Sequence, residues 1–478
     1  MKNYQAIAGL IICTILLSPV TAVSESLPLV AVNKANEIID ATLEAYGGAE
    51  TITNLKSLEQ ESTTIGLAVN QSRKPEPPWD KNETESLNAI EFGSDLFVTR
   101  NKGLANGFEF DNGTVINGDN SYQLNFRAKT AARIAEPDFN TTSGPYIRIT
   151  SVLLVKQLQN RRQTSHWLGE VEIDGRAHDV ITLVMEVGPA LSLYIDQETH
   201  LLTRSERVLP PFGSVDYRFS EYKSIDGIPI NQEFELYVND DLNLQISITS
   251  TRINKPIQHL AEHSDELENI AAVTPDVLSM QELDDGVYLI GGTGTYVMFV
   301  EMDNYVVAIG GTAGLPDRIK EFRKAVPSKP IRYGVLTHHH SDHVLGVPSY
   351  AEENATILTV AENESVVRAA SGGANDVDLE FVNGSRVLGD GTRSVEIHDI
   401  GPTPHAEHLL IAYLPNEGII LEADHFPLPR TGPMPPAIPN TEAFAKALAK
   451  NDFKVNKIVG AHSPRIASQE DLDNALRQ

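Results

Sequence analysis

The chain has 478 residues, with 38 Lys and Arg against 65 Asp and Glu, which gives a formal charge of −27. So acidic a chain lacks the basic surface that binds phosphate backbones, and we expect no nucleic-acid partner. A single Cys excludes a disulfide framework and a Cys-rich zinc site, so any metal must be held by His, Asp or Glu. At roughly 150 residues per domain, the length predicts two or three domains.

The N-terminus has the pattern of an export signal. Lys2 precedes an apolar run over residues 7–17, and the small residues of Pro19-Val20-Thr21-Ala22 follow. The run is shorter than the ~20 residues that a membrane-spanning helix needs. We therefore expect residues 1–22 to be a signal peptide, with cleavage after Ser24 or an uncleaved anchor as alternatives. The mature chain would be periplasmic or secreted, without a membrane span.

The region after the signal has the pattern of an antiparallel sheet with helices. A helix-like stretch over residues 33–46 stops at Gly47-Gly48. From residue 57 to 253, short alternating runs are separated by turn dipeptides such as Asn117-Gly118 and Asp226-Gly227. One further helix is expected at 146–158. These patterns predict a β-rich domain over residues 25–265, built on a curved antiparallel sheet.

The pattern changes after the polar stretch at 254–273, and residues 274–478 form a second predicted domain. Strand-like and helix-like segments now alternate, which is typical of an α/β domain. The whole chain is therefore predicted to be a two-domain protein of the α+β / α/β class, with an antiparallel sheet and helices in the N-terminal domain and an α/β C-terminal domain. The expected strands are 333–336, 356–360, 395–400, 409–414, 418–423 and 455–459; the expected helices are 315–325, 347–353, 362–370, 441–450 and 469–476.

The segment Thr337-His338-His339-His340-Ser341-Asp342-His343 directly follows a predicted strand. His338 and His340 are two residues apart and can converge on one cation through their imidazole nitrogens. Asp342 and His343 suit a second cation. A solvated polar loop without metal is the alternative interpretation. His339, between the two expected ligands, is expected to face solvent rather than line a pocket.

Two cations need more ligands than these four residues supply. His405, Asp424 and His462 each follow a predicted strand immediately. Strand ends are where α/β domains place their ligands, so we expect all three to join the metal site. The Pro-rich stretch at 427–439, after Asp424, is either a lid over the substrate or a connector.

These residues, in this order, resemble the metallo-β-lactamase superfamily over residues 280–478, and most of all its glyoxalase II-like branch. The resemblance implies an αββα sandwich and a dinuclear metal site. Zn2+ is the preferred ion, with Fe or Mn as alternatives, because imidazole and carboxylate ligands suit several ions. In this pattern the first metal is held by His338, His340 and His405; the second by Asp342, His343 and His462; and Asp424 bridges both.

The resemblance implies a hydrolase in which a metal-bridging hydroxide attacks an ester, thioester, lactone or related acyl bond of a small molecule. Asp342 is the expected catalytic residue, because it can accept a hydrogen bond from the hydroxide and orient it. The intact Asp424 argues against a β-lactamase, and His340 against the di-iron oxygen-reducing branch. The alternatives are a β-lactamase, and an envelope ligand-binding protein with a silent metal domain.

The N-terminal region resembles outer-membrane lipoprotein carrier-type half-barrels, through its leading helix, its meander and the segment at 220–229. This resemblance implies a curved sheet with an apolar concave face. Such a face either binds an acyl chain or is packed shut by its own helix, and we favour the packed form. No pattern in the sequence indicates the oligomeric state.

Overall fold

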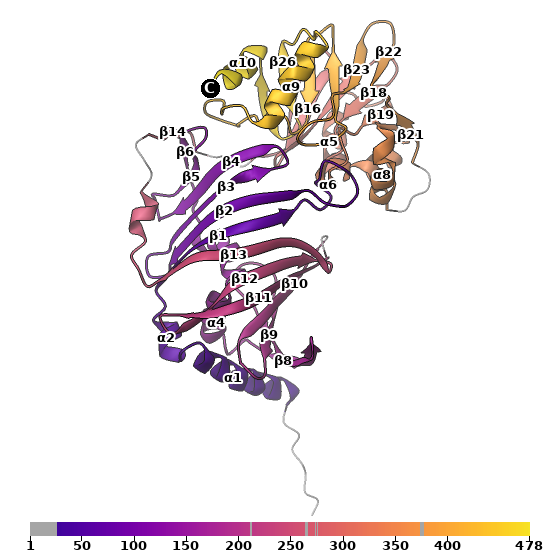
Figure 1. Ribbon diagram of the computed structural model, residues 1–478. Coiled ribbons are helices and arrows are strands. Elements are labelled where there is room, and N and C mark those ends of the chain that lie inside the picture. The colour runs from indigo at the N-terminus through magenta and orange to yellow at the C-terminus, as the bar shows by residue number, and fades with distance from the viewer. Residues whose placement is uncertain (1–25, 211–212, 263–265, 273, 275, 373–376) are drawn as a thin grey trace, which may run out of the picture.

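The computed structural model describes residues 26–210, 213–262, 266–272, 274, 276–372 and 377–478. The expected signal peptide, residues 1–22, lies outside them. The described residues form a sheet-rich α+β structure with sheets of fourteen, seven and six strands (Figure 1). None of the helices in this part of the chain is both long enough and apolar enough to cross a membrane.

The fourteen-stranded sheet, with its helices, is called here the N-terminal sheet. Its neighbouring strands are antiparallel, as predicted, except that β14 pairs with β6 in parallel. The first strand, β1, pairs with both β2 and β13, so the start and end of the meander meet in the middle. The strands are β1 (Ser57–Leu67), β2 (Lys81–Glu91), β3 (Leu96–Ala105), β4 (Phe108–Ile116), β5 (Tyr122–Asn125), β6 (Thr130–Arg133), β7 (Trp167–Ile173), β8 (Arg176–Leu183), β9 (Leu191–Asp196), β10 (Leu202–Leu209), β11 (Gly213–Ile225), β12 (Ile228–Val238), β13 (Asp241–Ile253) and β14 (Glu268–Ile270).

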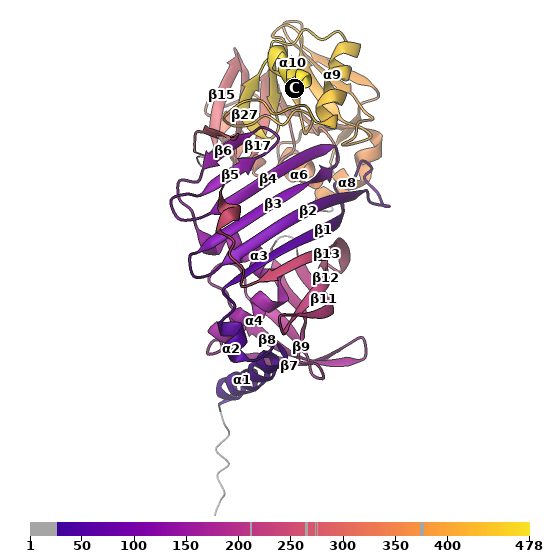
Figure 2. The ribbon, with the colours of Figure 1, turned by 60° about the vertical axis from the view of Figure 1, so that its left-hand side comes forward.

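Helices pack against the N-terminal sheet and share its main apolar core, which contains Ile39, Leu154 and Phe234. Figures 1 and 2 show the sheet curving, with α1 and α2 at the end remote from the C-terminal part. The helix-covered face is thus packed shut. A short 3-10 turn, η1 (Gln258–Ala261), lies in the segment whose Ile257 belongs to a second, smaller core. The helices are α1 (Leu27–Ala45), α2 (Ala49–Thr53), α3 (Phe139–Arg148) and α4 (Ser151–Asn160).

The single helix expected at 146–158 is two helices, α3 and α4. Thr150 adopts an extended backbone between them, with φ −122° and ψ 107°, which ends one helix before the next begins. Asp138 caps α3 by accepting a hydrogen bond from the backbone N–H of Thr141. The apolar periodicity alone did not mark this break.

The other two sheets pack face to face, with helices on both outer sides, and are called here the C-terminal sandwich. One core, containing Val300, Leu358 and Ile397, fills the space between the sheets. Separate cores join each sheet to its own helices, so the layers run αββα. The first half comprises β15 (Ser279–Asp284), β16 (Val287–Gly292), β17 (Thr295–Glu301), β18 (Val306–Ile309), α5 (Leu315–Phe322), β19 (Ile331–Val335), α6 (Ser341–Val344), α7 (Val347–Glu352), β20 (Thr356–Thr359), η2 (Ala361–Asn363), α8 (Glu364–Ala370) and β21 (Leu379–Phe381).

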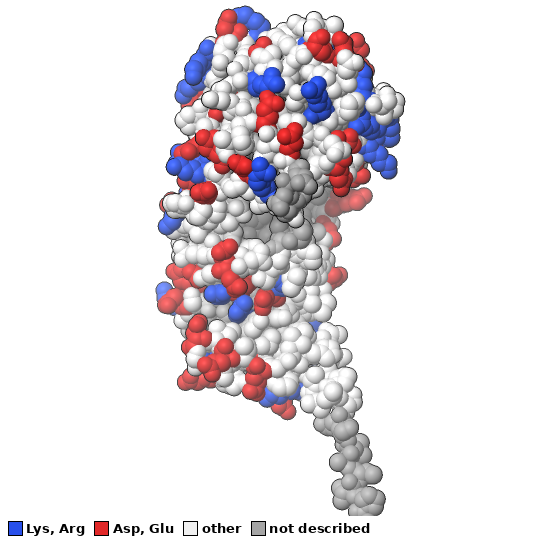
Figure 3. Space-filling view, turned by 90° about the vertical axis from the view of Figure 1, so that its right-hand side faces the viewer, with Lys and Arg blue, Asp and Glu red and all other residues white. Residues whose placement is uncertain are grey.

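The second sheet of the sandwich carries the C-terminal helices on its outer face. Its strands lie side by side in chain order from β22 to β27, and only the pair β25–β26, which α9 connects, is parallel. The elements are β22 (Ser385–Gly389), β23 (Ser394–Asp399), β24 (Leu410–Leu414), β25 (Ile419–Glu422), α9 (Pro439–Lys450), β26 (Lys457–Gly460), β27 (Ser463–Ala467) and α10 (Gln469–Arg477). Figure 3 shows acidic and basic side chains interspersed over both parts of the molecule on the face in view.

Two connections of the N-terminal sheet reach the C-terminal sandwich. The β1–β2 connection lies beside α6 (Figure 1), where the backbone N–H of Ser341 donates to the Asn70 carbonyl over 3.1 Å. The β3–β4 turn meets α9, where the Asn440 side chain donates to the Asn106 carbonyl over 3.0 Å. These contacts join the two parts next to the His-rich segment.

Replacing Gly107 with Ala is expected to disturb the contact at the β3–β4 turn. Gly107 has φ +79°, and an added Cβ would overlap the Asn440 side chain. Gly118→Ala is the matched control, because Gly118 also has positive φ but open space around it. Both variants share a backbone cost of about 1–2 kcal/mol. We expect Gly107→Ala to lower the apparent Tm further than Gly118→Ala; equal shifts in calorimetry would contradict this.

Candidate metal centre

The His-rich segment begins where the buried strand β19 ends and runs into α6. His338, His340 and His343 are all fully buried. A buried polar ring costs free energy unless its nitrogens have partners. The Thr337 hydroxyl oxygen supplies some of them, lying 3.1 Å from Nδ1 of His338 and 3.4 Å from Nδ1 of His343.

The second sheet of the sandwich brings the other three expected ligands to the same place. His405 lies between β23 and β24, Asp424 follows β25, and His462 lies between β26 and β27. Asp424 has φ +63°, a left-handed conformation that Asp tolerates better than most residues. Its carbonyl accepts a hydrogen bond from the Asn440 side chain over 3.1 Å, which fixes this turn.

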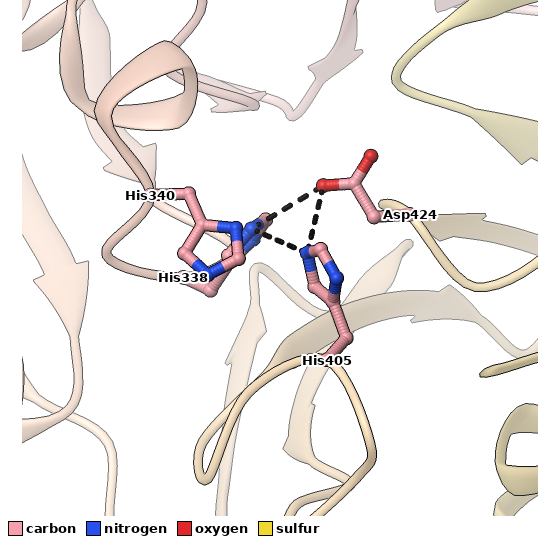
Figure 4. Close-up of side chains that lie close together, drawn as sticks. All are labelled: His338, His340, His405 and Asp424. Atoms are coloured by element: carbon pink, nitrogen blue, oxygen red, sulfur yellow. Dashed lines mark hydrogen bonds and ion pairs between the residues drawn. The ribbon is translucent and has the colours of Figure 1, made fainter. Parts of the chain in front are cut away.

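The first group of ligand atoms comes from His338, His340, His405 and Asp424, and all four atoms lie within 4.8 Å of one another. Nε2 of His338 is 3.1 Å from Nε2 of His405. Oδ2 of Asp424 lies 3.3 Å from each of these two nitrogens. Figure 4 shows His338 and His340 on one loop, converging with His405 and Asp424 from two others.

The second group comprises Asp342, His343 and His462. Oδ2 of Asp342 is 3.4 Å from Nε2 of His343, which is 3.1 Å from Nε2 of His462. Asp424 also reaches this group, with Oδ2 at 2.8 Å from His343 and Oδ1 at 2.9 Å from His462. The structure thus brings all seven expected residues together, with Asp424 between the two groups.

The ring nitrogens fit divalent ions in both groups. Metal-binding His residues hold their other ring nitrogen against a carbonyl or similar partner. Nδ1 of His340 is buried without a hydrogen-bond partner among the described residues, and it belongs to the first group. The opposite nitrogens of three rings face backbone carbonyls: His340 that of Ser72 at 2.9 Å, His405 that of Asn106 at 3.1 Å, and His462 that of Gly294 at 2.9 Å.

The electrostatics of the metal-free site favour positive charge. Burial opposes the ionised form of Asp424, but the charge of His343 and hydrogen bonds from neighbouring rings hold its pKa well below the usual range. Burial likewise opposes the charge on His343, yet Asp424 and Asp342 raise its pKa to about 10. Burial and the neighbouring His residues lower the pKa of His338 well below its usual value. A proton on His343 therefore occupies a place that a cation would take.

The N-terminal sheet contributes residues to this centre that the sequence did not indicate. Nε2 of Gln71 donates to Oδ1 of Asp342 over 2.9 Å. Burial raises the pKa of Asp342, but the hydrogen bond and charge of His343, together with Gln71, outweigh it and leave the pKa low. The Phe108 ring stands edge-on to His405, with centroids 5.4 Å apart. No motif marks either residue.

His339 does not face solvent, so that expectation was wrong. Its side chain is buried, and Nε2 lies 2.9 Å from the Ser72 carbonyl. The β1–β2 connection covers this ring, and its position there could not be foreseen from the His-rich segment alone.

The Pro-rich stretch after Asp424 is a packed connector that also borders a pocket. Phe426, Leu428 and Met434 are buried in the core beneath α9 and α10. Arg465 donates to the Gly432 carbonyl over 2.7 Å, which fastens the stretch to β27. Nearby Glu422 is fully enclosed, and burial raises its pKa to about 8 although two backbone N–H groups donate to it.

Comparison with known proteins places the C-terminal sandwich in a family. Residues 290–462 match the model of the metallo-beta-lactamase superfamily. Similar solved structures include a metallo-beta-lactamase from Pontibacter korlensis (16% identity, 42% of this chain and 98% of that chain, TM-score 0.35). Others are the FIM-1 metallo-beta-lactamase from Pseudomonas aeruginosa in its mono-zinc form (19%, 43% and 96%, 0.35) and the flavodiiron protein from Giardia intestinalis (15%, 43% and 59%, 0.34).

No curated protein matches the chain. The assignment therefore rests on the family model, whose matched residues run from β16 to His462 and include all seven candidate ligands. Residues 290–462 of this chain thus match a metallo-β-lactamase superfamily domain.

Proposed function

We propose that the protein is a metal-dependent hydrolase that holds two divalent cations and cleaves an ester, thioester, lactone or related acyl bond of a small molecule. The observation that carries this proposal is the position of Asp424, whose carboxylate contacts ring nitrogens of both ligand groups. Zn2+ is the preferred ion, with Fe or Mn as alternatives.

The donor set supports two cation sites that share one carboxylate. Bound divalent ions supply Lewis acidity and lower the pKa of water toward neutrality. In the proposed arrangement the first ion is held by His338, His340 and His405; the second by Asp342, His343 and His462; and both by Asp424.

Two side chains, those of Asp342 and Gln71, are proposed to position the attacking water. Asp342 is 44% exposed, so its carboxylate can reach a water molecule at the mouth of the site. Gln71 holds one carboxylate oxygen, and the other faces His343. Asp342 is therefore proposed to accept a hydrogen bond from the attacking water and to orient it toward the carbonyl of the substrate.

The other candidate functions fit these observations less well. A ligand carrier with a silent metal domain is not favoured, because the helix-covered face of the N-terminal sheet is packed. A β-lactamase is not favoured either, because an Asp bridges the ligand groups at 424. The same Asp supports a place in the glyoxalase II-like branch, and the pattern at residues 1–22 supports export to the periplasm or medium.

Removing the shared carboxylate is expected to empty the metal centre. We expect purified protein to hold two equivalents of divalent metal, and Asp424→Ala combined with His338→Ala to abolish both metal binding and ester hydrolysis. His398→Ala is the control, because His398 pairs with Glu396 away from the ligands. Metal analysis and kinetics decide: active protein with under one equivalent, or full activity in the double variant, would refute the proposal.

Metal affinity is expected to rise with pH. In the metal-free site the pKa of His343 is raised to about 10, so this ring is protonated at neutral pH and must lose its proton to bind metal. Below that pKa, binding releases one proton from His343, so the metal affinity should rise about tenfold for each unit of increase in pH. Zn2+ titrations between pH 6 and 9 against a competing chelator measure the slope, and an affinity independent of pH would contradict the expectation.

Shortening Gln71 is expected to slow the reaction without emptying the site. Gln71→Ala removes the hydrogen bond that holds Asp342. Outer partners of metal ligands typically contribute about 10- to 100-fold, so we expect kcat to fall within that range while KM and metal content change little. Gln123→Ala, at an exposed position of the same sheet, serves as control. Unchanged kcat in Gln71→Ala would show that Asp342 needs no such support.

A further inference from the structure

A pocket of about 220 Å³ adjoins the metal centre. Two of the expected metal ligands line this pocket: Asp424, which precedes β26 in the chain, and His462, which follows it. Its walls are largely apolar and come from the connector after β25, through Phe426, Pro427 and Leu428. The pocket therefore joins an apolar space directly to the proposed reaction centre.

One wall of this pocket comes from the other part of the molecule. Phe108, the first residue of β4, lines the pocket beside the ligand-bearing loops. The turn before it is held by Asn440, whose side chain donates both to the Asn106 carbonyl over 3.0 Å and to the Asp424 carbonyl over 3.1 Å. The ring of Phe108 is thus fixed relative to the metal centre.

The lining determines which chemical group fits. Phe426 and Leu428 are buried in the core of the sandwich, so the apolar wall is firmly supported. The one acidic residue apart from the ligand, Glu422, has an oxygen engaged by the backbone N–H groups of His425 and Phe426. The volume is below the roughly 300–1,000 Å³ of drug-sized sites, so a short chain or a single ring fits.

We propose that this pocket binds a short apolar group of the substrate next to the scissile bond, and that Phe108 sets the largest group that it accepts. The inference rests on the proposed hydrolase function. It gives the N-terminal sheet a direct part in substrate selection. The apolar group can belong to the acyl side or to the leaving group, and both share the same chemistry.

The test compares metal-loaded full-length protein with Phe108→Ala, Phe108→Trp and the control Phe110→Ala, whose ring lies beside Gly103 on the neighbouring strand. Two ester series separate the two sides of the bond: 4-nitrophenyl esters from acetate to octanoate, and acetate esters of methanol to octanol. In one series, Phe108→Ala is expected to raise the long-to-short ratio of kcat/KM about tenfold or more. Phe108→Trp should lower that ratio, and Phe110→Ala should leave it unchanged.

An equal loss on every chain length in the Phe108 variants, or unchanged ratios in both series, would overturn the inference, because Phe108 would then only support His405. Metal content is measured in each variant, because a loss of metal would show that Phe108 supports His405 rather than contacts the substrate. If the metal-loaded parent hydrolyses none of these esters, the proposed function fails instead. Calorimetric titration with carboxylates from acetate to octanoate then tests the pocket alone. Phe108→Ala should bind the longer acids more tightly relative to the shorter ones than the parent does. The same dependence of affinity on chain length in both proteins would overturn the inference.

Discussion

The carboxylate of Asp424 is the contact on which the metal centre depends. It lies between 2.8 and 3.3 Å from the nearest nitrogens of four rings, and the three segments that carry these rings come from two different sheets. Asp424 belongs to the first ligand group and lies 2.8 and 2.9 Å from two members of the second, His343 and His462. This edge of the sandwich thus places the Asp424 carboxylate where the ring nitrogens meet. The left-handed backbone conformation of Asp424 turns its side chain toward them.

Such a cluster is expensive to bury without cations. Four imidazoles, those of His338, His340, His343 and His405, share a largely buried volume with the Asp424 carboxylate, and each isolated charge in such a place costs several kcal/mol. Protonation of His343 offsets part of the negative charge when no ion is bound. Divalent ions replace that proton and satisfy the remaining nitrogens, including the buried Nδ1 of His340. The arrangement makes sense as a binding site and poorly as a purely structural network.

The ligand set could be read from the sequence because it follows local rules. His338, Asp424 and His462 come at the ends of apolar runs, and strand ends on one edge of a sandwich are brought together by the fold itself. Gln71 and Phe108 obey no such rule. Gln71 is 271 positions from Asp342 in the sequence. Alternation of apolar residues predicts a strand, but it does not predict which distant residues the connecting hairpin contacts.

The same limit explains the errors at finer scale. His339, between two expected ligands, was expected to face solvent, yet a connection from a distant hairpin covers it. The break at Thr150 between α3 and α4 depends on how two short helices pack, and helical periodicity continues through it. Local pattern thus predicted many of the helices and strands, and contacts between distant elements decided what surrounds the site.

The bonds from the N-terminal sheet to His340 and His405 end on peptide carbonyls, those of Ser72 and Asn106. Every amino acid carries that carbonyl, so these two bonds depend on the path of the backbone, which the Ser72 hydroxyl and the left-handed Asn106 help to set. What must be preserved is the path and length of each hairpin. Domain exchange between related chains would therefore keep the metal centre intact only when the two loops match in length and in backbone path.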